Sequence, residues 1–172
     1  MSEFVEQVRA VLQAGPPRWS ELVTHVPNDL LERAPAPGEW SALSCLQHLV
    51  DLDDAIFAGR ARSILAGEPF AAFDPAGDHA AHPIADGPTL VRELEEKRAR
   101  TLLVLDGITD ADLDRTGHHD KLGELSLRAH LSEWAGHDLM HMVQAERAIM
   151  QPFILESGVM RGFFRDHDIE AT

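Results

Sequence analysis

One stretch near the carboxyl end, residues 126–150, has the apolar spacing of a long amphipathic α-helix. Its apolar side chains recur every three or four positions, which places them on one face of a helix. They are Leu127, Leu131, Trp134, Ala145 and Ala148. Pro152 cannot continue the backbone hydrogen bonding of a helix and is expected to stop it. The stretch therefore predicts a helix over Ser126–Met150 with one face in a core.

Three further segments show the same period. We expect a first helix over Ser2–Ala14, ended by Gly15, Pro16 and Pro17, and shorter helical turns at Trp19–Val26, Leu30–Ala34 and Thr109–Leu113. A second long helix is expected from a cap at Ser41 or Ser44 to about Ala66, and a third from Thr89 to about Asp106. No stretch alternates like a strand for more than a few residues. The sequence predicts an all-α, four-helix bundle with short extra helices.

The remaining segments are predicted to be connections or ends. Glu68–Pro88 is rich in Pro, Gly, Ala and Asp and is expected to be a long connecting loop, while Thr116–Gly123 is expected to form a turn. A short apolar segment, Phe153–Phe164, precedes a polar tail, Arg165–Thr172. At 172 residues the chain is expected to be a single domain, 1–172, that can bury a substantial core without a structural metal.

Charge and composition exclude several classes of partner. The formal net charge of −14 argues against binding to nucleic acid or to anionic lipid, because both require basic side chains to neutralise phosphates. No apolar run has the length of a membrane span, and the first residues do not resemble a signal peptide. Cys45 is the single cysteine, so no intramolecular disulfide can form and a cytoplasmic location is expected.

Two histidines in the last long helix suggest a metal site. His137 and His141 are four positions apart, so both imidazoles leave the helix on one face, and that face is the apolar stripe. One divalent ion would satisfy both buried rings, and His48 in the second helix is the natural third ligand. Three imidazoles with the remaining positions open to water form a catalytic type of site. The alternative is a pair of core histidines hydrogen-bonded to Glu133 or to backbone.

Several neighbours could support such a site. Asp51, Glu133 and Asp138 have the spacing to orient an imidazole. Cys45, one turn before His48, is either a soft ligand, a reactive thiol or a small core residue. Among the other histidines, His118 and His119 would either line the mouth of the site or face solvent, and His79 and His82 are expected on the surface.

Two segments carry a resemblance to a known family. GEWSALSCLQHLVDLDD (Gly38–Asp54) and GELSLRAHLSEWAGHDLMHMVQ (Gly123–Gln144) resemble the signature segments of the DinB-like (YfiT-like) metal-binding four-helix bundle family. The matching positions are Trp40, Ser41, His48, His137, His141 and Gln144. The resemblance implies an up-down-down-up bundle, a mononuclear divalent site of zinc, nickel or a similar metal at the three histidines, and a homodimer. Members with assigned roles include thiol transferases that use bacillithiol or mycothiol, and a mycothiol-dependent isomerase.

Two functions of different classes follow from these observations. The first is a metal-dependent transferase or hydrolase, in which a divalent ion at His48, His137 and His141 activates water or a low-molecular-weight thiol towards a small electrophile. The second is a non-catalytic, stress-related metal-binding or interaction protein with a structural metal. A closed four-ligand site, for instance with Cys45 bound, would favour the second function, and a site open to solvent would favour the first.

Overall fold

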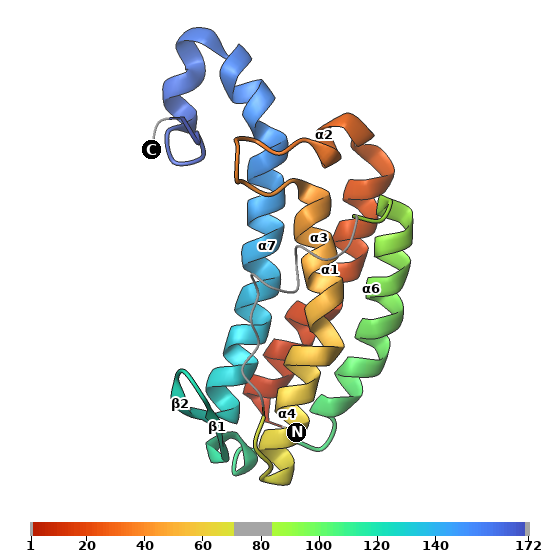
Figure 1. Cartoon of the computed structure of the whole chain (residues 1–172), viewed down its shortest axis with the longest axis vertical. Helices are drawn as coiled ribbons and strands as arrows, with labels where there is room; N and C mark the ends of the chain where they lie inside the picture. Colours follow the sequence, from red (N-terminus) through yellow and green to blue (C-terminus); the bar gives the residue numbers. More distant parts are fainter. Residues whose placement is uncertain (1, 71–83, 171–172) are drawn as a thin grey trace.

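The computed structural model describes residues 2–70 and 84–170, and its frame is a bundle of four long helical segments (Figure 1). These segments are α1 (Glu3–His25), α3 (Ala42–Leu52) with its continuation α4 (Gly59–Ala66), α6 (Gly87–Thr101) and α7 (Leu127–Glu156). In Figure 1, α1 and α7 run upward while α3 and α6 run downward. This is the predicted up-down-down-up bundle.

Shorter elements connect the long helices. They are α2 (Asn28–Glu32), the 3₁₀ segments η3 (Leu102–Leu105) and η4 (Asp112–Asp114), and the strands β1 (Thr116–His119) and β2 (Gly123–Ser126). A further 3₁₀ segment, η5 (Gly158–Phe164), follows α7. The two strands pair antiparallel, with Thr116 opposite Ser126 and His119 opposite Gly123. The hairpin lies at the end of the bundle where α7 begins (Figure 1). No helix in the described part of the chain is long and apolar enough to cross a membrane.

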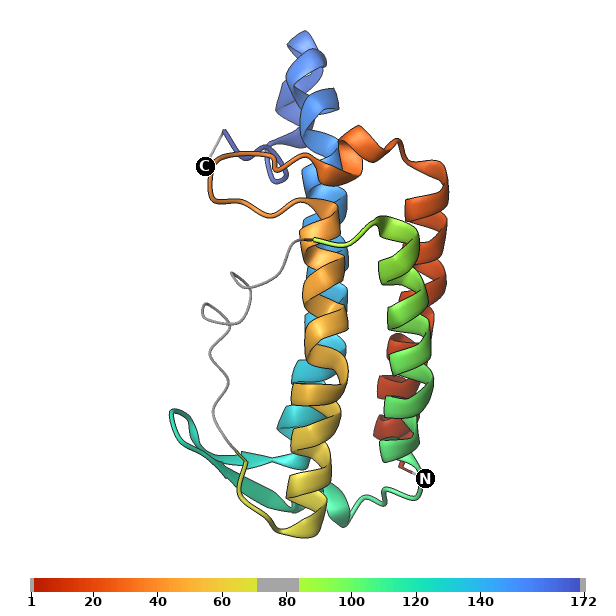
Figure 2. The same ribbon diagram turned by 45° about the vertical axis from the view of Figure 1, so that its right-hand side comes forward.

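The helices pack in two pairs, α3 beside α7 and α1 beside α6 (Figure 2). Their apolar faces form two buried clusters along the bundle. One contains Leu12, Phe57, Leu131 and Trp134, and the other contains Trp19, Cys45, Leu46 and Met142. Both clusters draw residues from α1, the α3–α4 segment and α7, so burial of these faces fixes the relative positions of α3 and α7.

The predicted break at residues 15–17 is wrong, because α1 runs through it to His25. Pro16 and Pro17 each lack the backbone N–H of a helical hydrogen bond, which weakens the helix locally. The buried face nevertheless continues across them, from Leu12 through Pro16 to Trp19. Gly15 also allows close packing, since an added Cβ would lie 3.0 Å from Oδ2 of Asp138 on α7. Burial on the core side outweighs the lost hydrogen bonds.

The predicted end of the last long helix is also wrong, because α7 continues past Pro152 to Glu156. Gln151 and Ile154 extend its buried face across the proline. The polar tail is partly folded: Asp168 is buried and pairs with Arg161, and the carbonyl of His167 accepts hydrogen bonds from Arg147 and Gln151. The proline therefore removes one backbone donor without ending the helix.

The helix caps account for where the other helices begin and end. Ser41 accepts a hydrogen bond from the Ser44 backbone N–H at the start of α3, as predicted, and Gly67 has a φ of 72° at the end of α4. The third long helix begins at Gly87 rather than Thr89, because Asp86 is the capping residue. Gly87 and Pro88 of the predicted loop Glu68–Pro88 thus belong to α6, and residues 71–83 of that loop lie outside the described part.

Two local features were not predicted. Residues 116–126, expected to be a turn followed by a helix cap, form the hairpin of β1 and β2, whose four-residue strands are too short to show an alternating pattern. Between α3 and α4, the segment η1 (Asp53–Ala58) is a π-helix, which shifts the register of the residues that follow. Asp53 at its start is buried, whereas the acidic run Asp51–Asp54 is typical of a solvated face.

Candidate metal centre

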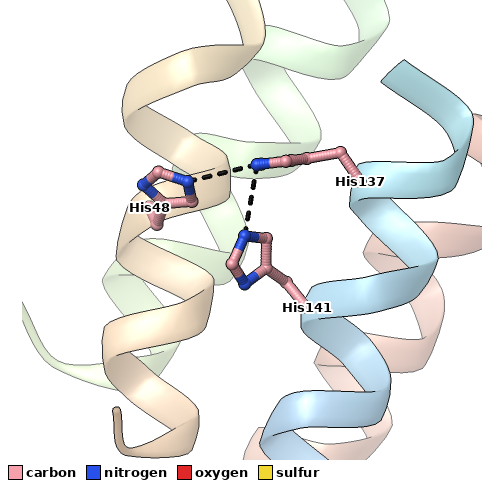
Figure 3. A group of neighbouring side chains, drawn as sticks. All are labelled: His48, His137 and His141. Carbon is pink, nitrogen blue, oxygen red and sulfur yellow. Dashed lines mark hydrogen bonds between the residues drawn. The ribbon is translucent and has the colours of Figure 1, made fainter. Parts of the chain in front are cut away.

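Three histidines from two facing helices meet at one point (Figure 3). The Nε2 atom of His137 lies 3.2 Å from Nε2 of His48 and 3.2 Å from Nε2 of His141. All three ligand nitrogens lie within 4.8 Å of one another. His48 comes from α3, and His137 and His141 come from consecutive turns of α7. The structure thus brings together the three residues that the sequence singled out.

The surroundings of these rings keep them largely away from solvent. His48 and His141 are each 4% exposed, and His137 is partly buried. Trp40 stacks on His141 with ring centroids 5.4 Å apart, and Phe57 lies 4.9 Å from the His137 ring. Burial against apolar side chains is costly for an imidazole nitrogen unless a hydrogen bond or a metal compensates for the lost water.

Hydrogen bonds among the three rings cannot supply that compensation. An imidazole nitrogen carries either one hydrogen or one lone pair, so Nε2 of His137 can make only one of its two 3.2 Å contacts as a good hydrogen bond. Its other nitrogen, Nδ1, is buried and has no hydrogen-bond partner within residues 2–70 and 84–170. His137 therefore lacks the bond to Glu133 or to backbone that an ordinary core histidine would make.

The two separations that involve His137 fit a metal ion. With metal–nitrogen bonds of about 2.0–2.1 Å, neighbouring nitrogens lie about 3.4 Å apart in a tetrahedral site and about 2.9 Å apart in an octahedral one. The two 3.2 Å separations fall between these values. Burial, followed by the charge of His141, lowers the pKa of His137 to about 4, so this ring is neutral near pH 7, the form that binds metals.

Gln144 orients one of the three rings. Its Oε1 lies 2.8 Å from Nδ1 of His141. Because an amide oxygen only accepts hydrogen bonds, Nδ1 carries the hydrogen in this contact and Nε2 keeps its lone pair towards the cluster. Sequence reasoning matched Gln144 to the family pattern without giving it a role. Its spacing of three residues from His141 on one helix was the available signal.

The three acidic residues expected to orient the histidines lie elsewhere. Asp51 is exposed and accepts from Gln47, and Asp138 is buried against Arg98. Glu133 lies 3.7 Å from Nδ1 of His130, a longer contact than a hydrogen bond. None of the three is hydrogen-bonded to a cluster histidine in the described part of the chain. Their spacing on a helix was correct for contact, but Gln47, His130 and Arg98 lie closer to them than the cluster histidines do.

A buried polar network lies beside the cluster. Arg98 donates to Asp53, to Asp138 and to the carbonyl of Leu12, and it is 2% exposed. Asp53 also accepts from Thr101 and from the Trp134 indole. This network joins α1, η1, α6 and α7. The sequence did not predict this network, because its members are far apart in the sequence and its charged residues lie in segments typical of solvated helix faces.

The remaining candidates are placed away from the cluster. Cys45 is buried in the apolar core, and burial raises its pKa to about 12, so the structure matches the interpretation as a small core residue rather than a ligand or a reactive thiol. His118 is exposed and pairs with Glu124, while His119 accepts from two backbone N–H groups of its own turn. His79 and His82 lie outside the described residues.

Comparisons with known proteins agree with the fold. The family model described as the DinB superfamily matches residues 12–145. A solved structure, YfiT from Bacillus subtilis, "a probable metal-dependent hydrolase with an unusual four-helix bundle topology", superposes with a TM-score of 0.71 at 20% identity. That match covers 86% of this chain and 87% of the YfiT chain. A search of the curated proteins found no match. At this identity the likeness to YfiT shows the fold alone.

Proposed function

Because this chain belongs to the DinB superfamily, we propose that it is a metal-dependent enzyme whose divalent ion is held by His48, His137 and His141. The observation that carries the proposal is the convergence of the three Nε2 atoms, with one nitrogen in contact with both others. Three imidazoles leave coordination positions open, which is the arrangement of catalytic rather than structural sites. Zinc and nickel are the metals we propose.

The residues around the site have definable tasks in such an enzyme. Gln144 fixes the tautomer of His141, and Trp40 and Phe57 hold the rings and keep bulk water from their apolar side. A divalent ion bound there would polarise an incoming group and favour its deprotonation near neutral pH. We propose a hydrolase or a thiol transferase, with water or a low-molecular-weight thiol as the nucleophile and a small electrophile as the substrate. YfiT, described as a probable metal-dependent hydrolase, supports the hydrolase variant.

An activity screen of the metal-loaded protein tests this proposal. The protein is incubated with a panel of small esters, amides and halogenated electrophiles, each with and without a low-molecular-weight thiol. Turnover that is lost in His137→Ala supports the enzyme, and the need for a thiol separates transferase from hydrolase. Absence of turnover in a stoichiometrically loaded protein would favour the second function, a stress-related binding protein with a structural metal.

The position of Cys45 weighs against that second function. A structural site is commonly closed by four protein ligands. Cys45, the soft ligand nearest in sequence to His48, is buried among apolar residues and does not belong to the group that could hold a metal. Among the described residues that group contains three histidines and no fourth ligand. A group of three ligands among these residues supports the catalytic function.

We also propose that the protein is a cytoplasmic homodimer. Support for the cytoplasm is the single cysteine, which forms no disulfide. The end of α7 and η5 project beyond the bundle (Figure 1). Support for self-association is a set of exposed large apolar side chains on these two segments. They are Phe153, Leu155, Val159, Met160 and Phe163. Light scattering during gel filtration tests the dimer, and a monomer at micromolar concentration would contradict it.

A further inference from the structure

Three buried nitrogens near the cluster have no hydrogen-bond partner among the described residues. The centroid of the Phe57 ring lies 4.9 Å from that of His137 and 5.9 Å from that of His130, and Nδ1 of both histidines belongs to this set. The third is Nε of Arg60, three residues after Phe57 in the same continuous helix. Since buried polar atoms are nearly always hydrogen-bonded, such nitrogens are available to a bound ligand.

Arg60 is the strongest candidate of the three. The residue is 9% exposed, and its guanidinium lies 5.7 Å from the centroid of the Phe70 ring. In the described part of the chain no carboxylate lies within ion-pair distance of it. Burial lowers the pKa of this guanidinium, and the charge of Glu133 opposes that shift. A nearly buried cation without a counter-ion is costly, and a bound anion would remove much of that cost.

His130 and Glu133 complete the surroundings of Arg60. His130 is fully buried, and its Nε2 donates to the Phe57 carbonyl at 2.8 Å. Its Nδ1 lies 3.7 Å from a carboxylate oxygen of Glu133. The Glu133 side chain is 49% exposed, so it lies at the boundary between the buried histidine and solvent. The His130 side chain, then the charges of Arg60 and His137, hold the pKa of Glu133 below its ordinary value. Glu133 therefore places a negative charge near Arg60 without forming an ion pair with it.

The geometry points to an anion-binding site at Arg60, next to His130 and Glu133, in which the guanidinium takes the carboxylate or phosphate of a small-molecule ligand. Phe57 lies between this site and the histidine cluster. Arg60 follows Phe57 by three residues, about 5 Å along a helix axis. A small-molecule ligand bound at Arg60 would extend past Phe57 to reach the cluster. The role of this anion in a substrate rests on the proposed function, whereas anion binding itself does not.

Anion titrations of the metal-free protein test the site independently of the metal. Inorganic phosphate and succinate are titrated separately by calorimetry into wild type, Arg60→Gln, Glu133→Gln and a matched control, Arg62→Gln. Arg62 is two residues from Arg60 but is exposed and pairs with Asp54 at 3.1 Å. The anion that binds shows whether the site takes carboxylate or phosphate.

We expect wild type and Arg62→Gln to bind one of these anions equally, and Arg60→Gln to bind it about tenfold more weakly or worse, because a charge-assisted contact is lost. Glu133→Gln should bind more tightly, since a competing carboxylate is removed. Arg60→Lys keeps the charge and should retain part of the affinity if the Gln variant fails to fold. Absence of binding in both wild type and Glu133→Gln, or equal binding in Arg60→Gln, would overturn the site.

Metal content measured on the same proteins separates this inference from the proposed function. Arg60→Gln should bind metal like wild type, because Arg60 is not among the three histidine ligands. If wild type binds the anion but cannot be loaded with metal, the metal site is refuted and the anion site stands. If wild type can be loaded with metal but binds neither anion, the anion site is refuted and the metal site stands.

Discussion

Arg98 donates two hydrogen bonds to Asp138 inside the bundle, from Nη1 to Oδ2 at 2.8 Å and from Nη2 to Oδ1 at 3.1 Å. Both residues are nearly inaccessible to solvent, at 2% and 6% exposed. Asp138 directly follows His137 on α7, so the pair ties the helix with two of the candidate ligands to α6. Arg98 also donates to Asp53, which links α6 to the helical segment that follows His48.

Arg98→Met should destabilise the protein by about 3–5 kcal/mol, because it leaves two carboxylates buried without their cation. Urea unfolding followed by circular dichroism measures this change. Arg92→Met, on the exposed face of the same helix, is the control and should stay within about 0.5 kcal/mol of wild type. Equal stability of the two variants would show that the buried network does not hold α6 to α7.

Gln144→Ala should weaken metal binding about 10–100-fold while leaving the helix content unchanged, because His141 loses the acceptor that fixes its tautomer. Competition with a chromogenic chelator gives the affinity. Gln13→Ala, an exposed glutamine of α1, is the matched control. Unaltered affinity in Gln144→Ala would show that this hydrogen bond does not orient a metal ligand.

The stability of the metal-free protein should fall as the pH is lowered from about 6.5 towards 4. The pKa of His137 is lowered from 6.5 to about 4 in the folded protein, with burial as the first cause. Between these values the unfolded chain takes up a proton that the folded chain does not, which favours unfolding. Urea midpoints at pH 7 and pH 5 measure the effect.

His137→Gln is the control for that pH dependence, because glutamine does not titrate. The difference between its midpoints at pH 7 and pH 5 should be smaller than that of wild type. An equal difference in the two proteins would assign the pH dependence to other groups.

Cys45 should be unreactive in the folded protein. Its pKa is raised to about 12 by burial, so almost no thiolate exists near neutral pH and reagents cannot reach the sulfur. Labelling with a thiol-reactive dye should be slow in buffer and rapid in urea. Rapid labelling without urea would contradict the placement of Cys45 in the core and revive it as a reactive group near the site.

The helices of the bundle were predictable because the apolar period of each is a local property of the sequence. The ends of α1 and α7 were not, since Pro16 and Pro152 read as stops. Whether a proline ends a helix depends on how much buried surface the next turn gains, and that gain comes from other helices. The π-helix that begins at Asp53 was not predictable either, and the buried partner of Asp53, Arg98, lies 45 residues away.

The candidate ligands were predictable for a different reason. His137 and His141 share a helix face by spacing alone, and His48 was added as a ligand by its place in a helix expected to face them. The partners of these residues were harder to predict, because Glu133 and Asp138 have the correct spacing for contact but lie against His130 and Arg98. Arg60 was not singled out, since a single arginine in a helix is typical of a solvated face.

The most direct test of the account is the metal content per chain, measured by mass spectrometry on protein purified without a histidine tag. Wild type and His118→Ala, which changes an exposed histidine, should each contain about one divalent ion, and His48→Ala should contain little. His48 and His137 belong to different helices, so loss of metal in both His48→Ala and His137→Ala would show that both helices supply ligands. Folded wild type that stays free of metal after incubation with zinc and nickel would contradict the account.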